Sequence, residues 1–297
     1  MKLLKAAREA IIERLIQVSG FLAVLFVILI LAFLLRDALP VLKTVSLGAM
    51  LGGDRWSPSA EPPKLGLLPM LLGSLYVTFG ALILAVPLGL ACAVFLSEVA
   101  PPALREILKP VVELLAAVPS VIFGFLGLLL VGPWLQEVLG LPIGQFAALG
   151  SLILAFMALP TIVSVSEDAL RAVPQAFRHN SLALGATEWQ TIARVTFPAA
   201  RSGLLAAVLL GMGRAIGETM TVLMVTGNAP VIPRGLEAFV RPVRTMTATI
   251  ASEMGEVAAG SAHYHALFMI GLLLLLITLA VNLAAAAIVR RTGVVRK

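Results

Sequence analysis

Long apolar segments alternate with short polar ones along most of this chain. A helix needs about 20 mostly apolar residues to cross a bilayer. Six segments meet that requirement, and they run from Val18 to Leu35, Leu68 to Leu96, Val111 to Leu130, Phe146 to Val165, Leu204 to Thr226 and His265 to Val289. The pattern therefore predicts an all-α, polytopic membrane protein with about six transmembrane helices.

Helix-breaking residues lie inside three of these predicted spans. Pro87 falls in the second span, Pro119 and Gly124 fall in the third, and Pro160 falls in the fourth. A proline inside a membrane helix is tolerated where neighbouring groups satisfy the freed carbonyl, and it often marks a kink. We therefore expect the third span in particular to be bent or broken.

Composition and charge support the membrane assignment. The chain is 60% hydrophobic and only 13% charged, whereas soluble domains contain about 25% charged residues. The formal net charge is +6, but the lysines and arginines lie in short clusters between apolar runs. This placement argues against a nucleic-acid-binding surface and is typical of loops that flank membrane spans.

The distribution of these cations predicts the orientation and the organisation of the chain. With the N-terminus in the cytoplasm, the inside segments hold 14 lysines and arginines and the outside segments hold 7. Because cytoplasmic loops carry the excess of positive charge, we expect both termini inside. Residues 1–17 then form a cytoplasmic segment and residues 18–297 a transmembrane domain. Its long loops are about 36–67 and 227–264 outside, and about 167–201 inside.

The fifth span carries two charged residues, Arg214 and Glu218, in the string LGMGRAIGETMTVLMVTGN. A charge at membrane depth costs roughly 2.5–3.5 kcal/mol on insertion scales and usually faces a bundle interior or a water-filled pathway. Four residues apart on one helix, the two side chains share a face and can pair. One interpretation is a transport pathway, and the other is a structural ion pair that locks two helices. Gly211, Gly213 and Gly217 would let another helix approach closely.

The long inside loop has the pattern of two short helices joined at Gly185. Trp189, Ile192 and Val195 recur at helical spacing, and Pro198 ends the second piece. Such a compact helix–glycine–helix at the membrane surface suits docking into a groove on a soluble protein. An ordinary pair of surface helices is the alternative.

This segment resembles the cytoplasmic loop of bacterial ABC-importer permeases, which has the pattern E-A-A-x3-G-x9-I-x-L-P. The positions that match it or carry similar residues are Gly185, Val195, Phe197 and Pro198, and the residues that replace E-A-A are His179, Asn180 and Ser181. The departure removes the acidic residue that often opens the motif. The partner of that residue on the ATPase therefore does not carry over.

The last third of the chain narrows the resemblance. The strings GRAIGETMTVLMVTGN and RTMTATIASEMGEVAAGSAHYHALF, together with the second span, are similar to the PstC-type permease of the bacterial phosphate ABC importer, over roughly residues 10–295. The related PstA-type permease shares R-A-I-G-E-T, but the continuation M-x-V-L-M-V-x-G-N and the E-M-G-E string favour the PstC type. The resemblance implies a type I, MetI-like fold in the bacterial inner membrane. It also implies a role in phosphate translocation for Arg214 and Glu218.

The resemblance further implies a set of partners. They are a PstA-type permease that completes the pathway, a PstB-type ATPase dimer and a PstS-type periplasmic phosphate-binding protein. We expect no enzymatic activity and no cofactor in this chain, because it lacks the GxxxxGK[ST] motif that binds ATP. ATP would be hydrolysed by the partner ATPase.

The side chain of Arg214 suits a phosphate pathway, because an arginine stays charged and offers a planar fork of hydrogen-bond donors. Thr219, Thr221 and Thr226 would add hydroxyl donors if they face the pathway. Two alternatives remain open. One is a permease for another oxyanion, such as molybdate, sulfate or phosphonate, and the other is a membrane scaffold that senses phosphate without conducting it.

Other chemistry-bearing residues carry weaker signals. His263 and His265 are two apart, and Glu253 and Glu256 are three apart. Neither pair has the companions that a metal site or a hydrolase needs, and we expect His263 and His265 to join Tyr264 in an interfacial cluster. The outer-loop cations Arg234, Arg241 and Arg244 are expected to be solvated or interfacial, with docking of the binding protein as the alternative.

Overall fold

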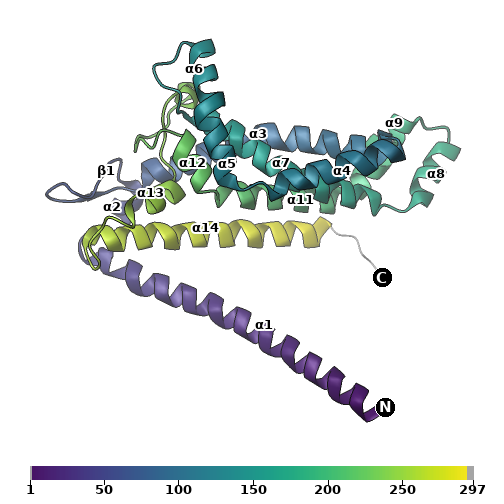
Figure 1. Cartoon of the computed structure of the whole chain (residues 1–297), viewed down its shortest axis with the longest axis horizontal. Coiled ribbons are helices and arrows are strands. Elements are labelled where there is room, and N and C mark those ends of the chain that lie inside the picture. Colours follow the sequence, from purple (N-terminus) through teal and green to yellow (C-terminus); the bar gives the residue numbers. More distant parts are fainter. Residues whose placement is uncertain (1, 293–297) are drawn as a thin grey trace.

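The computed structural model describes residues 2–292, and its long helices other than the first lie roughly parallel (Figure 1). Arg296 and Lys297, which belong to the predicted cytoplasmic C-terminus, lie outside the described residues. The longer helices are α1 (Lys2–Ala38), α3 (Leu68–Val94), α4 (Pro102–Ala117), α7 (Ala147–Arg171), α11 (Arg201–Ile216) and α14 (Ala262–Thr292). The prediction of an all-α, polytopic membrane protein is confirmed.

Short elements connect and cap these helices. The short α-helices are α2 (Leu47–Gly52), α5 (Ser120–Leu126), α6 (Gly132–Leu139), α8 (Gln175–Ala183), α9 (Glu188–Thr191), α10 (Phe197–Ala199), α12 (Met220–Val225) and α13 (Met246–Glu253). The π-helical turns are η2 (Phe95–Val99), η3 (Gly127–Val131) and η4 (Ile192–Thr196), and the 3-10 turns are η1 (Leu39–Lys43) and η5 (Leu236–Val240). Strands β1 (Trp56–Ser57) and β2 (Lys64–Leu65) pair antiparallel, with Trp56 opposite Leu65.

The centre of the bundle is the packing of α7 between α3 and α11. Ile162 on α7 is fully buried and fills the space above two glycines. A Cβ atom at Gly89 on α3 would lie 2.7 Å from an Ile162 methyl group, and one at Gly211 on α11 would lie 2.5 Å from another carbon of Ile162. The glycines are therefore what allows these helices to approach, as the sequence predicted for Gly211.

Two of the predicted spans are broken rather than continuous. In the third, α4 ends at Ala117 and α5 begins at Ser120, because Pro119 cannot continue the helix. The apolar segment that is long enough to cross a membrane runs from Ser120 to Leu139, so the predicted span from Val111 to Leu130 is wrong in its limits.

The fifth predicted span breaks after Ile216, and α12 begins at Met220. By length and apolar composition the described residues hold five helices that can cross a membrane. A sixth is counted if residues 188–199 and 201–216, which meet at an angle of 71°, form one span. The prediction of about six spans agrees with this number.

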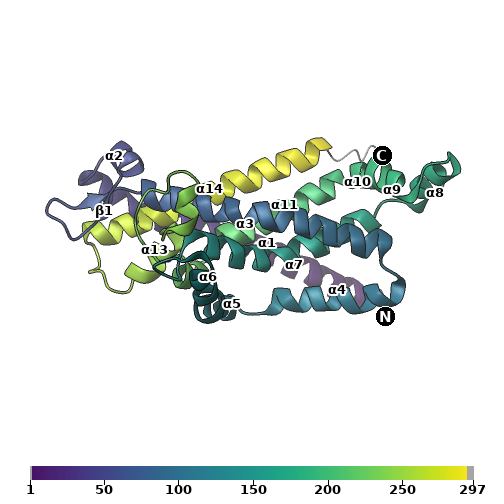
Figure 2. The ribbon, with the colours of Figure 1, turned by 90° about the horizontal axis from the view of Figure 1, so that it is seen from above.

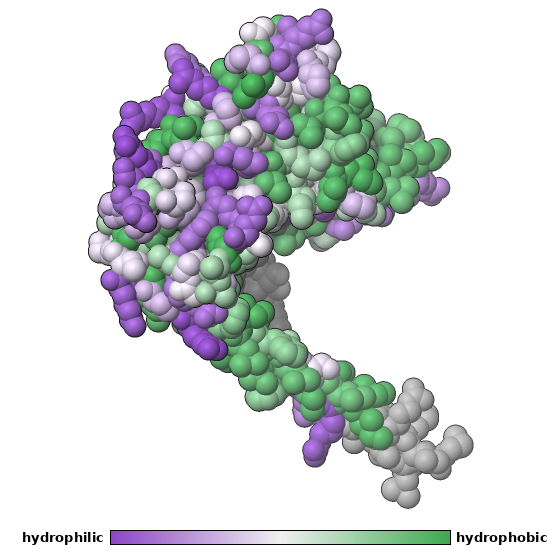
Figure 3. All heavy atoms as spheres, turned by 60° about the vertical axis from the view of Figure 1, so that its left-hand side comes forward, coloured by the Kyte–Doolittle hydropathy of each residue, from purple (hydrophilic) through white to green (hydrophobic). Residues whose placement is uncertain are grey.

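The first helix diverges from the bundle. It contacts α14 near its outer end and then runs away from the other helices (Figures 1 and 2). Phe33 packs edge-on against Phe268, and the ring of His265 is hydrogen-bonded to the carbonyl of Asp37 at 2.7 Å. Farther toward the N-terminus the apolar side chains of α1 are exposed, as Phe21 is at 69%. Hydrophobic side chains cover this helix and the flank of the bundle, and hydrophilic ones gather at the end of the bundle (Figure 3).

The arrangement yields a topology test. β1 and the start of α14 lie at one end of the bundle, and α8 lies at the other (Figure 1). In a Cys92→Ser background, needed because Cys92 is exposed, cysteines at Ser57 and Ser261 should react with an impermeant thiol reagent added outside. A cysteine at Ser181 should react only after the membrane is permeabilised. Labelling of Ser181 in intact cells would reverse the predicted orientation.

Candidate functional site

The breaks of the third and fifth spans meet at the side chain of Arg214, in the last turn of α11. Its Nη2 atom donates to the carbonyl oxygen of Ala116 at 3.1 Å, and its Nη1 atom donates to Oγ1 of Thr161 at 3.4 Å. The Ala116 carbonyl belongs to the last turn of α4, where helical partners run out. The arginine therefore binds a carbonyl that the break in the third span exposes.

Glu218 lies in the three-residue break between α11 and α12. Its Oε1 atom accepts a hydrogen bond from the backbone N–H of Thr221 at 3.3 Å. Its own backbone carbonyl accepts one from the hydroxyl of Thr247 at 2.8 Å. Both its side chain and its main chain are thus held in place, the first by α12 and the second by α13.

Arg214 and Glu218 form no ion pair, although both lie within the described residues. The prediction that they pair on one helical face is wrong. It assumed a continuous helix, but α11 ends at Ile216 and the i, i+4 geometry ends with it. The half-buried arginine is consequently bonded only to neutral oxygen atoms among the described residues.

The predicted threonines differ in their surroundings. Thr221 is fully buried, and its hydroxyl donates to the carbonyl of Ser120 at 2.9 Å, which ties α12 to the start of α5. Thr226 is also buried and donates to Val222 within its own helix at 2.7 Å. Thr219 is half-buried in the break, where its hydroxyl donates to Gly217 at 3.3 Å. Of the three, Thr219 is the one that lies with Glu218 in the break.

A small cavity beside Glu218 brings together hydroxyl groups that the sequence reasoning missed. Ser74 and Thr78 contribute from α3, and Thr245 and Thr247 contribute from the start of α13. The cavity encloses about 10 Å³, room for about one water molecule. The i, i+4 spacing of Ser74 and Thr78 inside an apolar span was the available signal.

The predicted helix–glycine–helix is formed by α8, α9, η4 and α10, at the end of the bundle away from β1 (Figure 1). Gly185 has a φ of +85°, and a Cβ atom there would meet nothing within 4 Å. The glycine is therefore required by its left-handed backbone and not by close approach within this chain. Thr187 and Gln190 form a reciprocal capping box at the start of α9. A hydroxyl contact of 2.9 Å between Ser181 and Thr191 joins the two helices.

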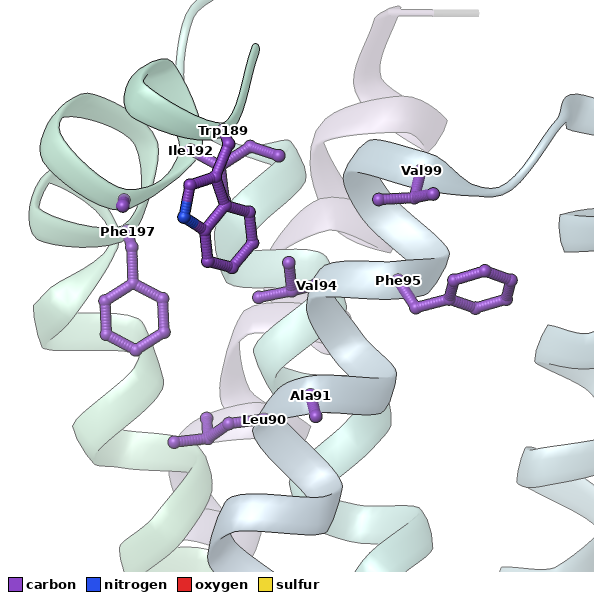
Figure 4. Close-up of a pocket in the computed structure, with 9 residues that line it drawn as sticks. Leu90, Ala91, Val94, Phe95, Val99, Trp189, Ile192 and Phe197 are labelled. Atoms are coloured by element: carbon purple, nitrogen blue, oxygen red, sulfur yellow. The ribbon is translucent and has the colours of Figure 1, made fainter. Parts of the chain in front are cut away.

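The tip of this segment exposes large apolar side chains. Leu184 is 89% exposed and Trp189 is 69% exposed. Among the motif positions, His179, Asn180, Gly185 and Pro198 are exposed, and Ser181, Val195 and Phe197 are half-buried. An apolar groove of about 490 Å³ lies between this segment and the end of α3 (Figure 4). Trp189 and Phe197 line one wall, and Leu90 and Val94 line the other.

A buried ion pair fastens this segment to the bundle. The guanidinium of Arg178 on α8 binds both carboxylate oxygens of Glu98 on η2, at 2.7 and 3.1 Å. It also donates to the carbonyls of Val173 and Leu170, at 2.7 and 2.9 Å. The two side chains are only 12% and 8% exposed. Sequence reasoning missed this pair because its members are 80 residues apart.

The end of the bundle that carries β1 contains a second cluster, around Glu253. Its carboxylate accepts from Arg244 at 2.6 Å, contacts the ring nitrogen of His263 at 2.7 Å and accepts from the indole of Trp56 at 3.1 Å. This cluster joins the hairpin, the loop before α13 and the start of α14. In the part of the chain that the structure describes, no group of three or more acidic, His or Cys side chains is arranged to hold a metal ion.

Comparison with known proteins identifies the family to which this architecture belongs. The pattern of the binding-protein-dependent transport system inner membrane component family matches residues 85–294. The chain is 42% identical to the probable ABC transporter permease protein YqgH of Bacillus subtilis, over 75% of this chain and 71% of that protein. It is 33% identical to the phosphate transport system permease protein PstC of Haemophilus influenzae, over 88% of both chains.

Solved structures agree on the fold. An inward-facing form of the MetNI methionine ABC transporter superposes with a TM-score of 0.60 at 19% identity, covering 76% of this chain and 96% of that one. A bacterial alginate ABC transporter superposes with a TM-score of 0.57 at 17% identity, covering 93% and 96%. The fold is that of the ABC importer permeases.

The chain thus has the class features of a multi-span transport protein, with the helix–glycine–helix of residues 175–199, the candidate docking segment, at one end of the bundle. It belongs to the family of inner membrane components of binding-protein-dependent transport systems. A permease of this kind works with an ATPase and a substrate-binding protein.

The Glu98–Arg178 pair generates a stability prediction. Glu98→Gln leaves the arginine without its counter-charge, and breaking a buried pair from one side costs about 3–5 kcal/mol. We expect a clear loss of thermal stability in detergent. Glu237→Gln breaks the Arg241–Glu237 pair, whose side chains are 68% and 82% exposed, and should cost at most about 1 kcal/mol. Equal effects of the two substitutions would show that the buried pair does not anchor α8.

Gly185 generates a second prediction. Gly185→Arg places a side chain on a left-handed backbone, which costs about 1–2 kcal/mol, and projects it from the docking segment. We expect loss of ATPase co-purification and of transport with the protein still in the membrane. Gly260, before α14, has a φ of +78° and equally open surroundings. Gly260→Arg carries the same backbone cost and should leave ATPase co-purification intact.

Proposed function

We propose that this chain is the PstC-type permease subunit of an ATP-driven importer of inorganic phosphate, and that it forms half of the translocation pathway. Relatives named as PstC phosphate permeases support the substrate, with 36% identity to that of Mesorhizobium japonicum over 77% of this chain. The observation that carries the proposal is Arg214, a cation at the break of the fifth span with no carboxylate partner among the residues that the structure describes.

The bonding of Arg214 suits the passage of an anion. An arginine has five N–H donors, and two of its hydrogen bonds go to neutral oxygens, one of them long at 3.4 Å. A guanidinium that is not neutralised by a carboxylate keeps its attraction for an approaching phosphate. Its planar fork matches two phosphate oxygens. Glu218 and Thr219, in the adjacent break, are the neighbouring polar groups of the same pathway.

The other end of the bundle supplies the coupling to ATP. The exposed apolar tip around Leu184 and Trp189 fits a groove on a PstB-type ATPase dimer. Arg178 and Glu98 would pass its movement to α3, because the pair is buried and bidentate. A PstA-type permease would complete the pathway, and a PstS-type protein would deliver phosphate from outside. ATP is hydrolysed by the ATPase, and this chain binds no cofactor.

The site prediction concerns Arg214. Hydrogen bonds to a charged group contribute about 1.5–3 kcal/mol each, so Arg214→Gln should lower phosphate uptake at least tenfold in the assembled complex. Arg214→Lys should recover only part of the uptake, because a point charge lacks the fork. Uptake of labelled phosphate into proteoliposomes that contain the complex and the binding protein is the measurement.

Two controls separate transport from structure. Arg36→Gln, at the exposed outer end of α1, removes the same charge elsewhere and should leave uptake unchanged. Thr161→Val removes one bond of Arg214 and should preserve most uptake. If an assembled Arg214→Gln complex takes up phosphate normally, the role of the arginine is structural, through its bond to α4. Uptake of molybdate or sulfate in place of phosphate would assign another oxyanion. Phosphate-dependent signalling without uptake would favour the sensing scaffold.

A further inference from the structure

The carboxylate of Glu218 is unexpected beside an anion pathway. A negative side chain repels an anion, and a charge at membrane depth is costly to keep. Glu218 does not offset Arg214 by an ion pair in this structure, so charge balance does not explain its presence. Among the residues that the structure describes, its Oε1 atom accepts one hydrogen bond, from the N–H of Thr221 at 3.3 Å. The carboxylate therefore retains acceptor capacity toward the break.

The carboxylate is fixed in position. The bond from Thr221 holds the side chain, and the bond from the Thr247 hydroxyl to the Glu218 carbonyl holds the main chain at 2.8 Å. Thr245 and Thr247 are themselves joined, with 3.2 Å between their hydroxyl oxygens. Ser74 accepts from the backbone of Met246 at 2.9 Å, which ties α3 to the same loop. These contacts fix the main chain at Glu218, and the bond from the N–H of Thr221 is the one that the carboxylate would break by turning away.

The chemistry of oxyanions then divides into two classes. Phosphate and arsenate carry at least one hydroxyl group near neutral pH, whereas sulfate and molybdate carry none. A hydroxyl can donate to the carboxylate in a short, charge-assisted hydrogen bond. An anion without a hydroxyl presents only lone pairs to it, and the repulsion remains uncompensated.

We infer that Glu218 selects protonated oxyanions by accepting a hydrogen bond from the substrate hydroxyl, while Arg214 binds the ionised oxygens. This inference rests on the proposed function and adds the substrate class of that same site. The cavity of about 10 Å³ that Glu218 lines with Ser74, Thr78, Thr245 and Thr247 is too small for a phosphate, so the anion would meet the carboxylate outside that cavity.

The test measures anion binding by the assembled permease–ATPase complex in nanodiscs, without the binding protein, so that the selectivity of the binding protein does not contribute. Bound radioactive phosphate is displaced by arsenate, sulfate or fluorophosphate. Fluorophosphate is a tetrahedral dianion like hydrogen phosphate, but it has fluorine in place of the hydroxyl. Because a site built for a substrate hydroxyl strongly rejects an analogue without one, arsenate should compete within about tenfold of phosphate, and sulfate and fluorophosphate should be about 100-fold weaker or worse.

Glu218→Gln is the matching variant, since an amide can donate to an anion that has no hydroxyl. It should bring sulfate and fluorophosphate at least about tenfold closer to phosphate. Glu256→Gln, an exposed glutamate after α13, should leave the discrimination unchanged. Fluorophosphate provides a test on the wild-type complex even if Glu218→Gln does not assemble.

Three results would overturn the inference. The first is competition by fluorophosphate as strong as that by arsenate in the wild type. The second is unchanged discrimination in an assembled Glu218→Gln complex. The third is phosphate binding by the wild type no tighter than by Arg214→Gln. The proposed function is tested separately by phosphate uptake with the binding protein present, so uptake can stand where this selectivity fails.

Discussion

Backbone groups that are exposed inside a membrane must find partners within the protein, because lipid offers none. This constraint governs the centre of the molecule, where α4 stops before Pro119 and α11 stops after Ile216. Each break leaves backbone polar groups without helical partners, and side chains beside one break bond to backbone groups beside the other. Arg214 binds the end of α4, and Thr221 binds the start of α5. The polar site of the bundle is thus a consequence of joining two interrupted spans.

The same constraint explains why the site is precise. The breaks are backed by α7, which packs closely against α3 and α11 through Ile162 and the glycines that face it. A hydroxyl on α13 completes it, since Thr247 holds the main chain of Glu218. A short displacement of α11 against α4 or α13 would change the partners of both charged residues. The site therefore lies where relative movement of the helices would change its hydrogen bonds.

The end of the bundle that carries α8 and α9 is built on a different principle. There, a buried bidentate pair between Arg178 and Glu98 fixes one face of the docking segment, and the opposite face leaves Leu184 and Trp189 exposed. A segment that is rigidly attached on one side and apolar on the other can transmit a push from a soluble partner. The π-helical turns η2 and η4 line the groove between the segment and α3. α3 ends and α11 begins beside this segment. Movement at this end would therefore reach the centre of the bundle along these two helices.

The sequence alone determined the membrane class, the approximate number of spans and the two short helices joined at Gly185, and it singled out Arg214 and Glu218 as candidate pathway residues. These follow from local composition and from the cost of burying charge. Both are properties of a single segment and do not depend on how the segments pack together. The tertiary structure decided that Arg214 pairs with carbonyl and hydroxyl oxygens instead of Glu218, because helix continuity across Gly217 depends on packing against α5 and α13. It also decided the pairing of Arg178 with Glu98. Contacts between residues so far apart arise only when the helices that carry them pack together.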